Sequence, residues 1–173
     1  DAGAGLVLAD EGCRGLCPSS LPCLPLDEMA QPSGGGAPAA SVVVGARDPA
    51  LILYTSGSTG RAKGVVVSHG AYGWVLDTRT RGVDLSGDCY VVAAPLYHMN
   101  ALNTVQLALR GRARVVLLPQ FEASAYLRAV ARYRATTLTM VPAMIGLMAR
   151  ETELLATLDL GPVSRKPTSN QAV

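Results

Sequence analysis

A short stretch rich in glycine and hydroxyl side chains, lying between two apolar runs, constrains this chain more than any other feature. It reads Thr55, Ser56, Gly57, Ser58, Thr59, Gly60, Arg61, Ala62 and Lys63. The flanking runs are Leu51 to Tyr54 and Val65 to Val67, and the β-branched residues of the second run favour a strand over a helix. The sequence therefore predicts a hairpin whose long connection carries this stretch.

The connection has the composition of a polyphosphate-binding loop. Gly57 and Gly60 permit a positive φ and a close approach of the backbone to a ligand, and successive amide groups in such a turn form an anion-binding concavity. The side chains able to bond phosphate or hydrated Mg²⁺ are Thr55, Ser56, Ser58, Thr59, Arg61 and Lys63. The alternative is a solvated loop without a ligand, because serine, threonine and glycine are common in loops.

Two better-known loops of similar composition are excluded. The nucleoside-triphosphatase loop requires Gly-Lys-Ser/Thr at the start of a helix, whereas here Lys63 is followed by Gly64 and a β-rich run. The serine-hydrolase elbow, Gly-x-Ser-x-Gly, does not occur in the stretch. A phosphate-binding role for this loop would therefore place it in another class of phosphate-binding protein, and the loop without a ligand stays the alternative.

Residues Tyr54 to Gly64 resemble the phosphate-loop signature of the adenylate-forming enzymes, which comprise acyl-CoA synthetases, peptide-synthetase adenylation domains and luciferases. Ala62 stands where most members carry proline. A second block, Pro95 to Ala101, resembles the family motif beside the carboxylate substrate, and Phe121 to Met148 follows the same order of elements. The resemblance covers roughly residues 48 to 151.

The resemblance implies an ATP-dependent acid–thiol ligase of the acyl-CoA synthetase type, which forms an acyl-adenylate and then an acyl-CoA. It implies ATP, Mg²⁺ and coenzyme A as cofactors, a small carboxylic acid as substrate, and a place in fatty acid metabolism. The implied cofactor-binding residues are Thr55, Ser56, Gly57, Ser58, Thr59, Gly60, Arg61, Lys63 and Gly64, with Thr55 facing the metal. Lys63 and His98 are the implied catalytic residues. The choice of acid and of acyl acceptor stays open.

His98 follows an apolar run that ends at Pro95, so it is expected at the carboxyl end of a strand, where open α/β sheets bind ligands. There it would steer the substrate carboxylate, and Tyr97 would wall the acyl pocket. The alternative is a histidine at a helix start that bonds a neighbouring carbonyl. His69 is expected to be a capping or surface residue.

The expected fold class is α/β, as part of the large domain of an adenylate-forming enzyme. After the hairpin, strands alternate with helices, which implies parallel strands joined by helical crossovers. The expected strands are 50–54, 65–68, 89–94, 114–118 and 136–141, and the expected helices are 69–81, 99–110, 122–134 and 142–151. The expected core side chains are Trp74, Tyr126, Tyr133, Met140, Met144 and Met148.

Three segments are expected along the chain. Residues 1–47 are an irregular segment with a Pro/Gly-rich connector, a buried strand at 5–9 and an edge strand at Val42 to Val44. Residues 48–158 are a partial AMP-binding domain, and 159–173 are a disordered tail unlike the family. Within the 173 residues we find no Tyr-Gly-x-Thr-Glu or Thr-Gly-Asp segment and no C-terminal domain of the family. The chain alone is therefore expected to be inactive, either as a truncated ligase, as a phosphate-binding module without catalysis, or as an unstable remnant that associates through exposed sheet edges.

Composition excludes several other classes. With 49% hydrophobic and 16% charged residues the chain does not resemble a disordered protein, and a net charge of +2 does not indicate nucleic-acid binding. No apolar run reaches the length of a membrane span. Cys13, Cys17 and Cys23 match no usual zinc spacing, so reduced thiols in a cytoplasmic protein are expected. The first residue is Asp1 rather than methionine, which indicates a processed chain or a fragment.

Overall fold

The computed structural model describes residues 3–29, 41–55, 62–161 and 163. They fall into two units, residues 1–44 and 45–173. The first unit contains β1 (Val7–Ala9), η1 (Arg14–Leu16), β2 (Cys23–Pro25) and α1 (Leu26–Met29). The second contains β3 (Pro49–Thr55), β4 (Lys63–Ser68), α2 (His69–Thr80), β5 (Cys89–Val92), α3 (Met99–Arg110), β6 (Arg114–Leu117), α4 (Ala123–Tyr133), β7 (Thr137–Leu138), α5 (Pro142–Met148) and α6 (Thr152–Thr157).

The first unit is built on a short parallel pair, in which β1 lies beside β2 with Val7 opposite Cys23. The buried strand expected at residues 5–9 is thus shorter, and only Ala9 of β1 is buried. The edge strand expected at Val42 to Val44 is wrong, because these residues have no strand assignment and Val43 is 95% exposed. A β-rich composition yields a strand only where a neighbour supplies hydrogen bonds and packing.

The second unit begins with the predicted hairpin. Strands β3 and β4 pair antiparallel, and β4 leads directly into α2. The Ser68 hydroxyl accepts a hydrogen bond from the amide of Ala71 at 3.2 Å, so Ser68 is the N-cap of α2. Gly70 is needed at the start of this helix, because a Cβ there would lie 2.8 Å from the Ala46 carbonyl oxygen. Glycine at this position thus allows a close approach of two backbone segments.

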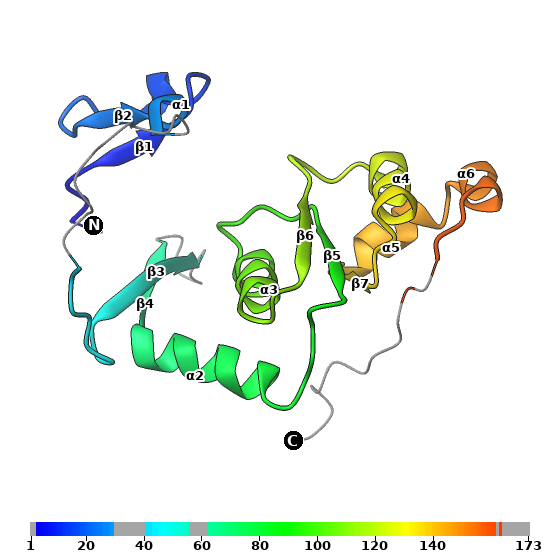
Figure 1. The fold of residues 1–173 in the computed structure, drawn as a ribbon. Helices are drawn as coiled ribbons and strands as arrows, with labels where there is room; N and C mark the ends of the chain where they lie inside the picture. Colours follow the sequence, from blue (N-terminus) through cyan, green and yellow to red (C-terminus); the bar gives the residue numbers. More distant parts are fainter. Residues whose placement is uncertain (1–2, 30–40, 56–61, 162, 164–173) are drawn as a thin grey trace. The chain divides into compact units, whose positions relative to one another are not determined.

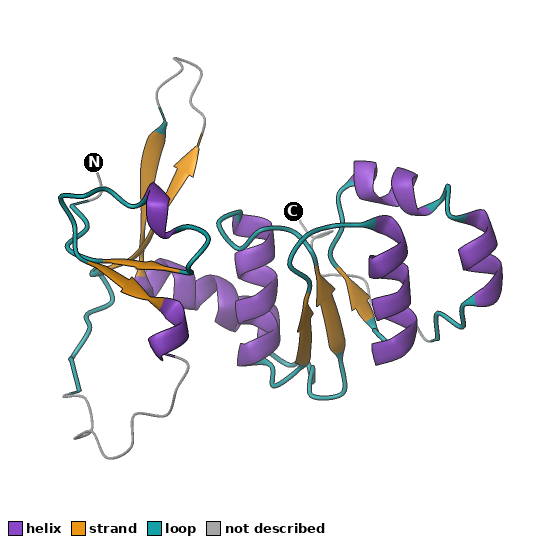
Figure 2. Cartoon of the chain, turned by 90° about the horizontal axis from the view of Figure 1, so that it is seen from above, coloured by secondary structure: helices purple, strands orange, loops and turns teal. Residues whose placement is uncertain are grey.

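A three-stranded sheet forms the centre of the second unit, in the order β6-β5-β7 with both pairs parallel. Helix α3 covers one face, and α4 with α5 covers the other (Figure 1, Figure 2). Strand β5 is buried along its whole length because it is covered on both faces. The predicted alternation of parallel strands with crossover helices is confirmed, although β7 has only two residues.

The main core lies between β5 and the pair α4 and α5. Its buried residues are Val91, Ala93, Tyr126, Leu127, Ala129, Val130, Ala135, Met144 and Met148. Met140 packs against this cluster, so it joins Tyr126, Met144 and Met148 as a confirmed core prediction, whereas Tyr133 is 39% exposed at the margin.

The expectation that Trp74 is a core residue is wrong, since its side chain is 67% exposed. Helix α2 packs against α3 and buries Tyr72. A residue two positions farther along a helix lies about 200° around its axis, and therefore on the opposite side. Leu109 of α3 is also exposed, and the buried positions of that helix are Ala101 and Ala108.

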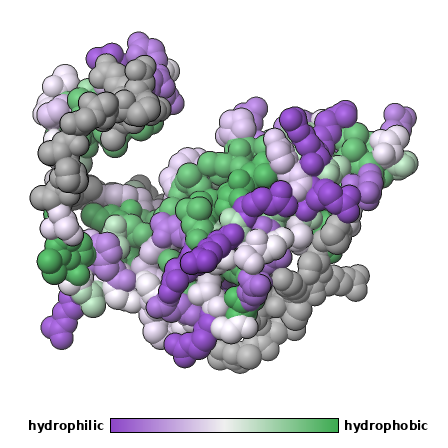
Figure 3. All heavy atoms as spheres, viewed as in Figure 1, coloured by the Kyte–Doolittle hydropathy of each residue, from purple (hydrophilic) through white to green (hydrophobic). Residues whose placement is uncertain are grey.

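Apolar side chains also reach the surface of the second unit. In the view of Figure 3 they gather over α3, β5 and β6. The exposed large apolar residues of this region include Leu96, Leu109 and Leu117. Among the described helices, none combines the length and apolar character needed to cross a bilayer.

Candidate nucleotide and carboxylate site

The open end of the hairpin brings together two of the predicted site residues. In the register of β3 and β4, Thr55 stands directly opposite Lys63, and Tyr54 stands opposite Gly64. The predicted loop residues Ser56, Gly57, Ser58, Thr59, Gly60 and Arg61 lie outside the described residues. Thr55 and Lys63 are both exposed, so a hydroxyl and an ammonium group flank the two ends of the loop.

Gly64 fits tightly against the strand opposite it. A Cβ at this position would lie 2.9 Å from Cγ2 of Ile52 and 3.3 Å from the ring of Tyr54. Ile52 and Tyr54 point to the same face of the hairpin, because they are two residues apart in one strand. Glycine at this position therefore allows the Tyr54 ring to lie across the backbone next to Lys63. This packing fixes the strand ends from which the loop departs.

The hydroxyl of Thr55 has the oxygen chemistry that Mg²⁺ prefers, and its exposure beside Lys63 fits a metal held mainly by phosphate oxygens and water. In the part of the chain that the structure describes, no three acidic, histidine or cysteine side chains gather as a metal-binding group. A hydroxyl such as that of Thr55 could add one oxygen ligand to a Mg²⁺ ion that arrives with a nucleotide.

His98 lies where the sequence predicted, after the carboxyl end of β5. The turn is closed by a hydrogen bond from the His98 amide to the Pro95 carbonyl at 3.0 Å, and the His98 carbonyl accepts from Leu102 at 3.1 Å. His98 is the N-cap residue of α3, but its side chain makes no capping hydrogen bond. The exposed imidazole instead lies against the Tyr97 ring, with ring centroids 4.6 Å apart and planes tilted by 51°.

A hollow of about 300 Å³ lies next to this motif, at the carboxyl ends of two parallel strands. It is lined by Ala94, Pro95 and Leu96 after β5, and by Leu117, Leu118 and Pro119 at the end of β6. These side chains are apolar, so the hollow suits the hydrocarbon part of a ligand. Sequence reasoning missed the contribution of β6, although parallel pairing of 89–94 with 114–118 would have placed both ends together.

A pair of threonines holds the start of α3 to the end of β7. The hydroxyls of Thr104 and Thr139 are 3.2 Å apart, and Thr104 also donates to the Asn100 carbonyl at 2.8 Å. These contacts anchor the first turns of the helix that follows His98. No sequence pattern singled out this pair, because the two residues are 35 positions apart.

A wider hollow of about 490 Å³ shares no residue with either motif. It is an open depression where α2 and α3 end, lined by Asp77, Arg81, Arg110 and Arg112 among others. Arg110 already pairs with Asp77 at 2.9 Å. Arg110, Arg112 and Arg114 are all exposed. We therefore place the site at the two motifs rather than in this larger hollow.

Comparison with known proteins points to the same family that the two motifs resemble. A family model described as AMP-binding enzyme matches residues 10–166. The indoleacetate–CoA ligase of Aromatoleum aromaticum is 39% identical over 107 residues, which are 61% of this chain and 21% of that protein. The 4-coumarate–CoA ligase 2 of Oryza sativa subsp. japonica is 34% identical over 135 residues, or 74% of this chain and 23% of that protein.

Among solved structures, the inhibitor-bound N-terminal domain of FACL13 from Mycobacterium tuberculosis superposes with a TM-score of 0.77 at 25% identity, covering 92% of this chain and 43% of that one. The chain spans only about a fifth of the length of the curated relatives it matches, at 21% and 23%. The α/β fold expected from the sequence is confirmed by this likeness. Because the family model covers most of its residues, the chain belongs to the AMP-binding enzyme family.

Proposed function

We propose that this chain carries the phosphate-binding hairpin and part of the carboxylate site of an ATP-dependent acyl-CoA ligase. The observation that carries the proposal is the placement of Thr55 opposite Lys63 at the hairpin end, with Gly64 packed beside them. The relatives named as CoA ligases support the same reaction class.

In this reaction a carboxylate oxygen attacks the α-phosphorus of ATP, and the bond to pyrophosphate breaks. A thiol, which we propose to be that of coenzyme A, then attacks the acyl carbon and releases AMP. The first step brings an anion toward a polyanion, so charge neutralisation and positioning must supply most of the catalysis. Lys63 neutralises the departing phosphates, while the loop residues 55–61 and Gly64 cradle them. The Thr55 hydroxyl would help to hold a Mg²⁺ ion bound to the phosphates, and that ion would supply further positive charge.

The second motif would hold the acid. The imidazole of His98 is exposed and free of helix capping, so it can donate a hydrogen bond to the carboxylate and direct it toward the α-phosphorus. The hollow formed by Leu96, Leu117 and their neighbours would receive the hydrocarbon part. Because the relatives are named for indoleacetate and 4-coumarate, we propose an aromatic carboxylic acid rather than a fatty acid as the substrate.

We further propose that these 173 residues alone turn over little or no substrate, and that they act inside the cell in the cytoplasm. One exposed hairpin and one histidine do not provide an adenine pocket, a ribose clamp and a metal carboxylate together. A phosphate-binding module without catalysis is the second candidate, since the placement of Thr55 opposite Lys63 at the hairpin end could serve phosphate binding alone.

Pyrophosphate exchange into ATP tests the ligase proposal. The isolated chain is expected to give little exchange with indoleacetate, 4-coumarate or a long-chain fatty acid. A hybrid protein is then made in which residues 48–158 replace the matching segment of the indoleacetate–CoA ligase. We expect this hybrid to give measurable exchange with the aromatic acids. In that hybrid, Lys63→Ala should lower the rate by roughly 10²–10³, the range for losing one electrostatic contact in a transition state.

Arg150→Ala, which removes an exposed charge at the end of α5, is the control and should leave the exchange rate of the hybrid unchanged. Robust exchange by the isolated chain would overturn the claim that it is inactive alone. A folded hybrid whose exchange does not respond to Lys63→Ala would overturn the role of the hairpin.

A further inference from the structure

The thiols of Cys17 and Cys23 lie in contact in the first unit. Their sulfur atoms are 3.2 Å apart, with the Cys23 thiol donating to the Cys17 sulfur. Both residues are partly buried and neither is in a disulfide. Six positions separate them in the chain, and the turn between them is closed by a hydrogen bond from the Leu21 amide to the Pro18 carbonyl at 3.1 Å.

The surrounding backbone holds this pair in place. Cys17 ends η1, and Cys23 begins β2, where it stands opposite Val7 in the parallel register. The Val7 amide donates to the Pro22 carbonyl at 2.8 Å, which fixes the chain just before Cys23. The backbone hydrogen bonds around residues 17–23 therefore help to hold the two sulfur atoms close together.

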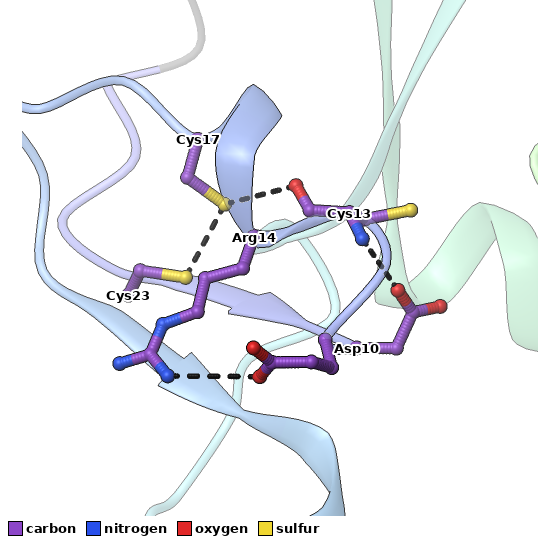
Figure 4. Close-up of polar contacts among 6 residues, drawn as sticks. Asp10, Cys13, Arg14, Cys17 and Cys23 are labelled. Carbon is purple, nitrogen blue, oxygen red and sulfur yellow. Dashed lines mark hydrogen bonds and ion pairs between the residues drawn. The ribbon is translucent and has the colours of Figure 1, made fainter.

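Cys13 is close in sequence but does not share this arrangement. Figure 4 shows its sulfur pointing away from the Cys17 and Cys23 pair. Its amide donates to the Asp10 carboxylate at 2.7 Å. The nearby Asp10 carboxylate raises the pKa of the Cys13 thiol, first through a side-chain hydrogen bond and then through its negative charge. The pKa of the Cys17 thiol is raised too, chiefly by its hydrogen bond with Cys23, so the choice of partners rests on the distance and direction of the sulfurs and not on thiol acidity.

We propose that Cys17 and Cys23 are a reversible oxidation site that forms a disulfide by exchange with a low-molecular-weight disulfide such as oxidised glutathione. Cys17 and Cys13 both line a hollow of about 340 Å³, so a small reagent can reach either thiol, but only the Cys17 sulfur lies against that of Cys23. The Cys17 thiolate attacks one sulfur of the reagent and releases the first thiol. Cys23 then gives up its proton, attacks the Cys17 sulfur and releases the second. One reagent disulfide is reduced to two thiols, and one protein disulfide is formed.

The bond would join the end of η1 to the start of β2 and close the turn at residues 18–22. Among the described residues of this unit only Ala9 is a buried apolar residue, so a cross-link would add a constraint that core packing does not supply. The site is independent of the proposed ligase function, since it uses none of the residues of the hairpin or of the His98 motif.

The test treats the full 173-residue chain with oxidised glutathione under native conditions, alkylates the remaining thiols, and maps the products by mass spectrometry. We expect loss of two hydrogens, a cross-link between Cys17 and Cys23, and alkylated Cys13 and Cys89. In urea, where the local backbone is unfolded, all three pairings among Cys13, Cys17 and Cys23 should appear. Dithiothreitol should restore the reduced chain.

Two variants sharpen the result. Cys23→Ser should trap the glutathione adduct on Cys17, because the second step has lost its attacking sulfur. Cys13→Ser is the matched control and should leave the rate and product unchanged. A native product that links Cys13 to either other cysteine in comparable yield would overturn the proposal, as would native and urea mixtures of the same composition. Loss of cross-linking in Cys13→Ser would also contradict it.

Discussion

At the scale of single residues, Tyr126 connects helix α4 to the central strand through one buried hydroxyl. Its side chain is completely buried, and its hydroxyl donates to the Val91 carbonyl at 3.1 Å. Burial raises the pKa of Tyr126 to about 12, because the ionised phenol would be held away from water. The Tyr126 hydroxyl therefore stays neutral and stabilises the packed core, and we assign it no role in the proposed ligase reaction.

Tyr126→Phe should lower the free energy of unfolding by about 1–2 kcal/mol, the effect of losing a buried hydrogen bond. Urea unfolding followed by circular dichroism measures this loss. The wild-type chain should also lose stability as the pH rises from 10.0 toward about 12, because Tyr126 ionises first in the unfolded state. That part of the pH dependence should vanish in the phenylalanine variant. Equal stability and equal alkaline slopes in the two proteins would refute this role.

The ends of some helices can be predicted from single residues in the sequence. Ser68 was predictable as an N-cap because hydroxyl side chains satisfy free amides there. Glu122 is the N-cap of α4, where its carboxylate accepts from the amides of Ala125 at 2.7 Å and Ser124 at 3.0 Å. These bonds lower the pKa of Glu122. Trp74 was misplaced because its burial depends on which side of α2 meets α3, which is information that no local pattern contains.

At the scale of elements, the β3–β4 hairpin depends on the absence of a side chain at Gly64. Gly64→Ala should reduce the local stability of the hairpin by about 1–3 kcal/mol, the usual effect of overpacking, because the nearest contact is the stiff β-branched side chain of Ile52. Hydrogen exchange of the paired amides in β3 and β4 measures the change directly. Gly73→Ala, in the middle of α2 with nothing within 4 Å, is the control and should stabilise its helix by up to about 1 kcal/mol. Faster exchange in the control, or unchanged exchange in the Gly64 variant, would contradict this packing.

Most elements could be predicted because their signals are local. The hairpin, α2, α3 and α4 follow from β-branched runs, caps and apolar periodicity, and the parallel sheet follows from the alternation of strands with helices. The strand expected at Val42 to Val44 and the full length expected for β7 failed for a shared reason. Strand extent is decided by the neighbour that supplies hydrogen bonds, and that neighbour lies elsewhere in the chain.

At the scale of the whole molecule, the site draws on distant segments that only the fold brings to one edge of a sheet. The His98 motif follows β5, and Leu117 to Pro119 follow β6, so their hollow exists because the two strands are parallel neighbours. The motif residues were visible in the sequence, but this second wall was not. The chain also belongs to a family whose matched relatives extend well beyond it, since it spans 21% of the indoleacetate–CoA ligase. Phosphate binding by the hairpin is therefore the property to measure on the 173-residue chain by itself.

The central claim is that the hairpin end around Thr55 and Lys63 binds the polyphosphate of a nucleotide. Calorimetric titration of Mg-ATP into the 173-residue chain tests it most directly, with Lys63→Ala as the test variant. Lys166→Ala removes the same charge at the only other lysine of the sequence and serves as the control. We expect a saturable heat in the wild type and in Lys166→Ala, and at least about a tenfold weaker affinity in Lys63→Ala, as for loss of a charge-assisted contact. Equal affinities in all three proteins, or no binding by the wild type, would contradict the claim.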